Sequence, residues 1–201
     1  IYYDIIKSEE CVPLGWNVNA NIAIVSAFSM HEDRAEAIRR GQDNFEFFRY
    51  SQQRLVAEDF VPGVSDMWSD FVAKRGDATD RLIKAALERS VYDGAGIGTP
   101  DDMTRHLKIF QECGVDQVIM LQQAGHNTHS NICESLELFA ETVMPNFAKD
   151  VEQREAAKAA ELAPYIEAAL ARKNYMPALR PEEVPVVKAS VRVAGEVPGR
   201  K

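Results

Sequence analysis

The sequence contains few cysteines and no long apolar run. Its 201 residues include only Cys11, Cys113 and Cys133, an odd number at wide spacing. A disulfide framework needs an even set of cysteines, so we expect reduced thiols and a cytoplasmic protein. A membrane span needs about 20 consecutive apolar residues, and no run approaches this length. We therefore expect no membrane partner.

Basic residues are also too few for a nucleic-acid surface. The chain has 23 Lys and Arg against 31 Asp and Glu, which gives a net charge of −8. Phosphate backbones need clustered Lys and Arg, so we expect no nucleic-acid partner. The hydrophobic content of 46% and the charged content of 27% are typical of an ordinary globular domain with one sizeable core.

Metal, nucleotide and nucleophile motifs are weak or missing. The metal-type residues His126, His129, Cys133 and Glu134 cluster, but the second ligand pair of a closed zinc site is not evident, and we predict no metal. The glycines of 94–98 lack the dinucleotide spacing, and no P-loop Lys follows. A turn before a helix is favoured there, while a phosphate or carboxylate at the helix start stays open.

Residues 98–147 have the pattern of a helix, a strand, a polar loop and a second helix. Thr99 suits the N-cap of the first helix and Pro100 its first position. Gly114 supplies the left-handed residue that ends a helix. Residues 115–121 form a β-rich apolar run, which predicts a strand covered on both sides.

The polar loop at 122–130 follows this strand. Strand side chains alternate, so one of Gln122 and Gln123 must point inward. Asn131 and Glu134 predict a capping box for the second helix, which Pro145 would close. This α–β–α unit is typical of a parallel α/β protein, whose loops at the strand ends carry the chemistry.

An earlier strand–helix unit lies upstream. Residues 22–28 predict a strand and 32–40 a helix with acidic residues first and arginines last. The long connection at 41–92 should contain its own helices, one of them at 79–90. Residues 150–173 favour a helix that Pro164 would break or kink, and 186–193 alternate enough for an added strand.

Several motifs, in order and spacing, resemble those of a known family. They are 98–102 (GTPDD), 124–129 (AGHNTH), 134–140 (ESLELFA) and 143–145 (VMP). They look like the C-terminal end of luciferase-like flavin-dependent monooxygenases, and residues 19–48 are similar to an earlier barrel segment of that family. The resemblance covers about residues 10–150.

The resemblance implies a (β/α)₈ TIM barrel, an α/β fold of about 250 residues. The chain has 201 residues and begins at Ile1, so we expect only the C-terminal half of the barrel. Residues 1–150 would form this C-terminal part, with a helical insertion at 41–92 that walls the active site. Residues 151–201 would form a helical and Pro-rich C-terminal extension.

The resemblance also implies a function. The parent enzyme would use reduced FMN, supplied by a flavin reductase, and O₂ to oxidise a small organic substrate; a deazaflavin cofactor stays open. The implied site residues lie at the strand ends. They are His129 as the catalytic residue, Gln122, Gly125, His126 and Thr99 as cofactor-binding residues, and Met30, His31 and Trp68 in the substrate pocket.

Plainer roles stay open for these residues. The family pattern has an Arg where His126 stands, so a charge contact is in doubt there and His129 is the stronger candidate. His129 could instead be a surface or helix-capping residue, and Trp68 plain core. The non-catalytic alternative is a half-barrel that mainly self-associates, since an open sheet leaves edges and one apolar face uncovered. We expect a homo-oligomer on either reading.

Overall fold

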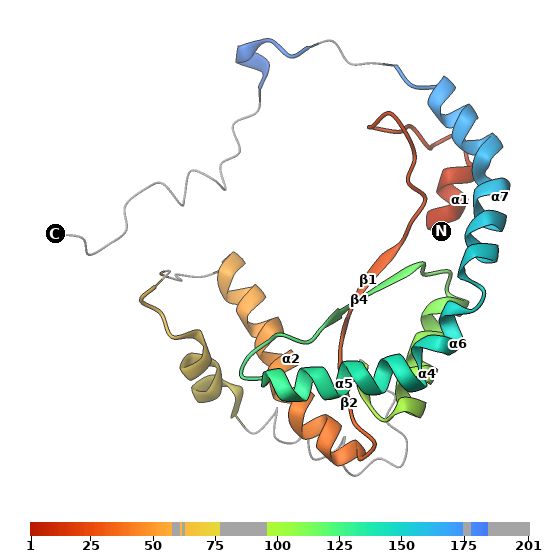
Figure 1. Ribbon diagram of the computed structural model, residues 1–201. Helices are drawn as coiled ribbons and strands as arrows, with labels where there is room; N and C mark the ends of the chain where they lie inside the picture. Colours follow the sequence, from red (N-terminus) through yellow and green to blue (C-terminus); the bar gives the residue numbers. More distant parts are fainter. Residues whose placement is uncertain (58–60, 62, 77–95, 175–177, 185–201) are drawn as a thin grey trace.

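The computed structural model describes residues 1–57, 61, 63–76, 96–174 and 178–184, which form a parallel α/β structure (Figure 1). The predicted helix at 79–90 and strand at 186–193 lie outside these residues. The helices are α1 (Tyr2–Lys7), α2 (Arg34–Ala57), α4 (Pro100–Glu112), α5 (His129–Thr142), α6 (Met144–Ala148) and α7 (Val151–Ala171), with a 3-10 turn η1 (Pro181–Glu183). The strands are β1 (Ala23–Ala27), β2 (Ser29–Met30), β3 (Ile97–Gly98) and β4 (Gln117–Leu121). Residues 67–76 are also helical.

A single extended segment holds the sheet together. β1 and β2 are separated only by Phe28, and they pair in parallel with β4 and β3 respectively. The amide of Phe28 donates to Leu121 O at 3.1 Å, and the amide of Ser29 donates to Gly96 O at 3.1 Å. Successive amides of an extended strand point to opposite edges, so the order across the sheet is β3, then β1 with β2, then β4.

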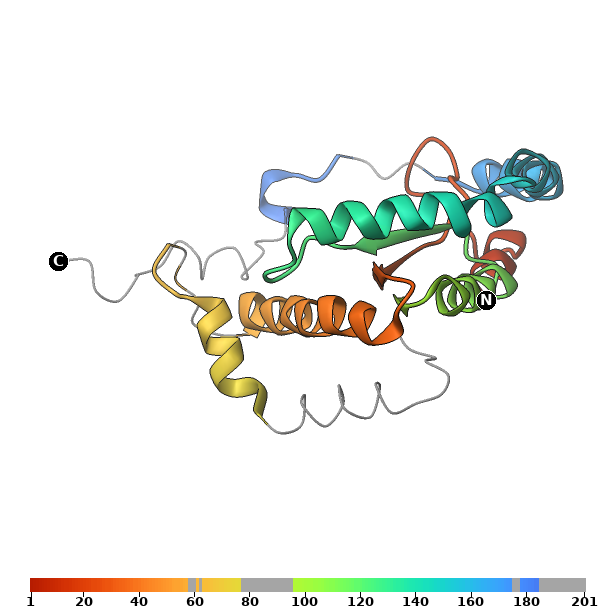
Figure 2. The same cartoon turned by 60° about the horizontal axis from the view of Figure 1, so that its bottom comes forward.

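This order differs from that of a (β/α)₈ barrel. In a barrel each strand pairs with the next one along the chain and the helices form one outer ring. Here β1 pairs directly with β4, and α2 and α5 lie on opposite sides of the strands (Figure 2). β3 has only two residues, whereas β1 and β2 form a longer apolar segment. This longer segment lies at the centre of the sheet, as in an open doubly wound fold. The α/β class is confirmed, and the barrel stays a prediction.

Each face of the central segment has its own apolar cluster, because strand side chains alternate. Ala27 packs with Ile38 of α2 and Ile97 of β3. Phe28 faces the other way, where α4 and α5 cover the sheet. The buried members of this second cluster are Phe28, Met30, Met103, Leu107 and Val143.

Part of the first face has no cover among the described residues. Val25 and Ile119 are direct register partners on β1 and β4, and they are 52% and 48% exposed. Parallel sheets are normally covered on both faces, so this apolar pair is free to pack against another surface.

The helix after β2 is longer than the predicted 32–40 segment. α2 continues through Gly41 to Ala57. A Cβ at Gly41 would lie 2.4 Å from Ser29 Cβ, so this glycine allows close approach of helix and strand rather than ending the helix. The predicted boundary at residue 41 is therefore wrong.

Two predicted helix boundaries after β4 are also wrong. α5 is capped by Thr128, whose side chain accepts from the amide of Asn131, so the helix begins before the expected Asn131–Glu134 capping box. Pro145 does not close α5, which ends at Thr142, but lies in the first turn of α6. α7 continues through Pro164, so this proline does not break the helix.

The start of α4 is as predicted. The Thr99 side chain accepts from the amide of Asp102, and the Asp102 carboxylate accepts from the amide of Thr99 at 3.0 Å. Asp102 is only 5% exposed and takes a two-pronged contact from Arg34, with Nη2 at 2.8 Å from Oδ1 and Nε at 3.0 Å from Oδ2. Gly114 ends this region with a φ of 77°, also as predicted.

Within the residues described, no helix combines the length and apolar character that a bilayer crossing requires.

A partly buried imidazole joins α4 to β1. His106 Nε2 lies 2.9 Å from Ser26 Oγ, and its ring centroid is 4.5 Å from that of Phe110. Burial lowers the pKa of His106 below its ordinary value of 6.5. The folded protein therefore favours the neutral imidazole more than the unfolded chain does.

We predict that His106 makes the free energy of unfolding depend on pH. Its contribution is fully present above the unfolded pKa of 6.5 and is lost as pH falls through the folded value, with a slope of at most about 1.4 kcal/mol per pH unit. Urea unfolding between pH 7.5 and 5 should show a smaller loss in His106→Gln than in the wild type. Lys108→Gln, an exposed change on the same helix, should follow the wild type. Identical pH profiles for all three proteins would contradict the assignment.

Candidate functional site

The predicted site lies at the carboxyl edge of the sheet. The segment after β2 and the loop between β4 and α5 leave neighbouring strands, and their helices α2 and α5 lie on opposite sides (Figure 2). Such a switch point is where open α/β sheets bind ligands, and the same edge carries the active site of a barrel. The position of the site therefore does not depend on which architecture the whole molecule has.

The turn at Gly125 and His126 sits on α2 and on the helix at 67–76. The His126 amide donates to Asn44 Oδ1 at 2.8 Å, and Asn44 Nδ2 donates in turn to Arg40 O at 2.6 Å. The His126 ring stacks on Trp68 with centroids 4.0 Å apart and planes 23° apart. Two cofactor-binding candidates thus meet a substrate-pocket candidate.

Trp68 belongs to a larger aromatic cluster as well. Its ring lies 5.1 Å from Phe47 and 5.6 Å from Phe71, centroid to centroid. Phe47 and Phe71 contact each other at 5.6 Å. Trp68 is therefore packed on one side as a core residue and presents stacking surface to His126 on another.

The loop after β4 contains two buried acceptors without donors. Gln122 is half-buried and Gln123 is exposed, so Gln122 is the residue that points inward. Gln122 O accepts from Asn127 Nδ2 at 3.0 Å, yet Gln122 Oε1 and Asn127 Oδ1 have no hydrogen-bond partner within the described part of the chain. An unsatisfied buried acceptor costs about 1–3 kcal/mol, so this loop favours a ligand or water that brings N–H or O–H donors.

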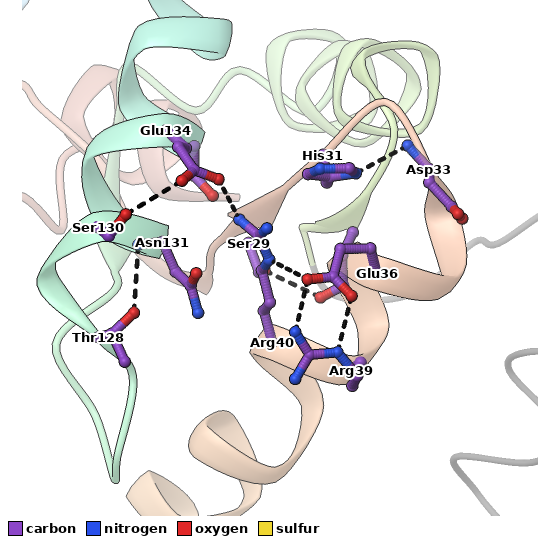
Figure 3. Close-up of polar contacts among 12 residues, drawn as sticks. Ser29, His31, Asp33, Glu36, Arg39, Arg40, Thr128, Ser130, Asn131 and Glu134 are labelled. Carbon is purple, nitrogen blue, oxygen red and sulfur yellow. Dashed lines mark hydrogen bonds and ion pairs between the residues drawn. The ribbon is translucent and has the colours of Figure 1, made fainter.

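A charge network spans the edge between α2 and α5 (Figure 3). Arg40 donates to Glu134 at 2.6 Å and to Glu36 at 2.5 Å, and Ser130 Oγ donates to Glu134 at 3.1 Å. Hydrogen bonds from Arg39 and Arg40 lower the pKa of Glu36 to about 2, and Arg40 likewise lowers the pKa of Glu134. Both carboxylates are ionised at neutral pH, so neither is suited to donate a proton.

Met30 and His31 have different surroundings. The Met30 side chain is fully buried in the cluster under α4 and α5, and its amide and carbonyl both bond Ser135 Oγ, at 3.1 and 2.8 Å. Its placement is that of a core residue. His31 is half-buried beside the Glu36–Arg40 network, and its Nδ1 accepts from the amide of Asp33 at 3.0 Å (Figure 3).

Thr99 and His129 make mainly local contacts. The Thr99 hydroxyl donates to Asp102 Oδ2 at 2.9 Å, which is a capping role for α4. His129 is the exposed first residue of α5, and its Nε2 lies 3.5 Å from Cys133 Sγ. The searched part of the chain holds no group of three His, Cys, Asp or Glu side chains arranged to bind a metal ion.

Sequence reasoning missed two residues of this edge. Asn44 holds the His126 amide, and Asn127 contributes one of the two unsatisfied oxygens. Asn127 lies within the motif at 124–129 and could have been singled out there. Asn44 has no such signal, because its role arises from the approach of α2 to a loop 82 positions away.

Searches against models of protein families and among curated proteins found no match to this chain. The family resemblance therefore rests on the sequence motifs alone.

We predict that Gly125 is required by packing as well as by backbone conformation. Its φ is +56°, and an added Cβ would lie 2.4 Å from Asn44 Oδ1 and 2.6 Å from Trp68 Cζ3. Gly125→Ala should therefore lower the free energy of unfolding by about 3 kcal/mol, which combines left-handed strain with overpacking. Urea unfolding measures this loss, and Trp68 fluorescence should change in the folded protein.

Gly76 supplies a matched control. It has a similar φ of +52° but no atom within 4 Å of an added Cβ. Gly76→Ala should cost only the left-handed strain, about 1–2 kcal/mol. Equal losses at the two positions would show that the Gly125 turn is not packed against Asn44 and Trp68.

Proposed function

We propose that this chain forms one wall of a reduced-FMN site in a luciferase-like flavin-dependent monooxygenase. The observation that carries the proposal is the position of the 124–129 motif in the fold. Its Gly125–His126 turn lies on Asn44 and Trp68 at the carboxyl edge of the sheet. Open doubly wound sheets bind FMN at this kind of switch point, and barrels carry their active sites on the same edge.

The residues present suit the flavin ring better than its phosphate. The ring has an N–H donor, and Gln122 Oε1 and Asn127 Oδ1 are buried acceptors that lack one among the described residues. Trp68 and His126 add aromatic surface. Arg40, by contrast, is already neutralised by Glu36 and Glu134, so the proposal assigns the phosphate to other parts of the molecule.

When bound, reduced FMN and O₂ would supply the oxidation of a small organic substrate, and a flavin reductase would deliver the reduced cofactor. Gln122 and Asn127 would orient the ring through its N–H group. His126 would hold the loop against Trp68, and the exposed His129 would hold or transfer a proton. A deazaflavin offers the same ring contacts.

The proposal includes the finer architecture and setting. A (β/α)₈ barrel would need its strands to pair in chain order, with β3 between β1 and β4, in place of the direct β1–β4 pairing described above. The enzyme would work in the cytoplasm. The free thiols of Cys11, Cys113 and Cys133 support a reducing compartment.

The test is a titration of the purified chain with FMN under anaerobic, reducing conditions and in air. We expect saturable binding, and we expect Asn127→Ala to weaken it by about tenfold, since one hydrogen bond to a buried acceptor is lost. Asn146→Ala, an exposed amide on α6, should leave the affinity unchanged. His129→Ala should lower the coupling of O₂ consumption to substrate oxidation. No saturable flavin binding by a chain of verified mass would refute the proposal for this chain.

A second candidate, a non-catalytic module that self-associates, is favoured by the exposed Val25–Ile119 pair. A second copy would bury this apolar sheet face. Sedimentation should then show a homodimer that Ile119→Lys converts to monomer, while Val64→Lys, at another exposed apolar position, leaves it intact. A wild-type monomer at high concentration would exclude this candidate.

A further inference from the structure

A cavity of about 620 Å³ lies at the opposite end of β4 from the proposed flavin site. Its lining includes Val115 and Asp116, just before β4, together with residues of α1, α4, α6 and α7. This volume is within the usual range of small-molecule sites, about 300–1,000 Å³. No motif of the sequence pointed to this end of the sheet.

The walls of the cavity are mostly apolar and aromatic. Val118 and Met120 come from β4, and α4, α5 and α7 add side chains above them. The added apolar residues include Phe110, Phe139 and Leu162. Aromatic and branched side chains of this kind favour the burial of an alkyl chain.

The rim carries charges that largely cancel in pairs. Lys7 pairs with Glu161, and Lys158 pairs with Asp116 at 2.9 Å and with Glu155 at 2.8 Å. All five of these side chains line the cavity. Three carboxylates are thus matched to two lysines.

Arg154 is the remaining cation of the rim. Its Nη2 donates to Phe147 O at 3.0 Å, and no carboxylate in the described part of the chain pairs with it. A guanidinium bound only to one carbonyl keeps several N–H donors for an anion, and its fork geometry matches a carboxylate.

We propose that this cavity binds a medium-chain aliphatic monocarboxylate. The carboxylate pairs with Arg154, and the alkyl chain lies on the apolar walls formed by Phe110, Phe139 and Leu162. An uncharged alkyl compound keeps only the apolar contacts, and an alkyl cation meets the unpaired guanidinium and is repelled. The proposal is independent of the flavin site.

Isothermal titration calorimetry of the full chain tests this with decanoate, decanol and decyltrimethylammonium, each below its micelle concentration. We expect one decanoate per chain, bound about tenfold more tightly than decanol, as one charge-assisted contact at a partly exposed site provides. The cation should not bind. Arg154→Gln should remove the preference for decanoate over decanol, whereas Arg49→Gln, an exposed arginine of α2 outside the cavity, should keep it.

A cavity-filling variant separates this site from adsorption elsewhere. Met144 is 47% exposed and lines the cavity, so Met144→Trp should fold and fill it. Loss of decanoate and decanol binding in folded Met144→Trp supports the proposal. Decanoate binding that survives Met144→Trp, a preference that survives Arg154→Gln, or no saturable decanoate binding each overturns it.

Discussion

The arrangement of the carboxyl edge depends on one buried carboxylate. Asp102, 5% exposed, accepts from the Thr99 amide and from Arg34 at the first position of α2. A buried charge must be paired, and removal of one partner of such a pair costs about 3–5 kcal/mol. The contact therefore ties the start of α2 to the start of α4 and to β3 just before it. That fixes the path along which α2 carries Arg40 and Asn44 to the loop after β4.

Along this path α2 approaches the sheet closely, and small residues make the approach possible. Gly41 lies against Ser29, and one turn later Asn44 accepts the His126 amide beside Gly125. The edge that results contains few free charges, because Arg40 is shared by Glu36 and Glu134. Aromatic rings remain, together with amide oxygens that have no donor among the described residues, and the proposed flavin would match them through its ring and its N–H group.

Local patterns were enough to predict local features. The N-cap at Thr99 and the turn at Gly114 each depend on a few adjacent residues, and both were predicted correctly. The end of α2 was not predicted correctly. A glycine such as Gly41 looks the same in the sequence whether it ends a helix or allows a helix to approach a strand. Thr128 and Asn131 are both good N-caps, and local rules do not choose between them. Strand order depends on long-range pairing, which periodicity does not contain.

The candidate site also depends on long-range contacts that local sequence patterns do not predict. The motif at 124–129 located Gly125 and His126, and aromatic character singled out Trp68, but only the approach of α2 brings them together through Asn44. Met30 was placed in the pocket by its position after a strand, and burial under α4 and α5 makes it core instead. The two ends of β4 then differ in kind. Its carboxyl end offers amide oxygens that have no donor among the described residues, and its amino end opens on an apolar cavity where Arg154 has no carboxylate partner among those residues. The ligands proposed for the two ends therefore differ, a planar ring with N–H donors at the carboxyl end and an aliphatic carboxylate at the amino end.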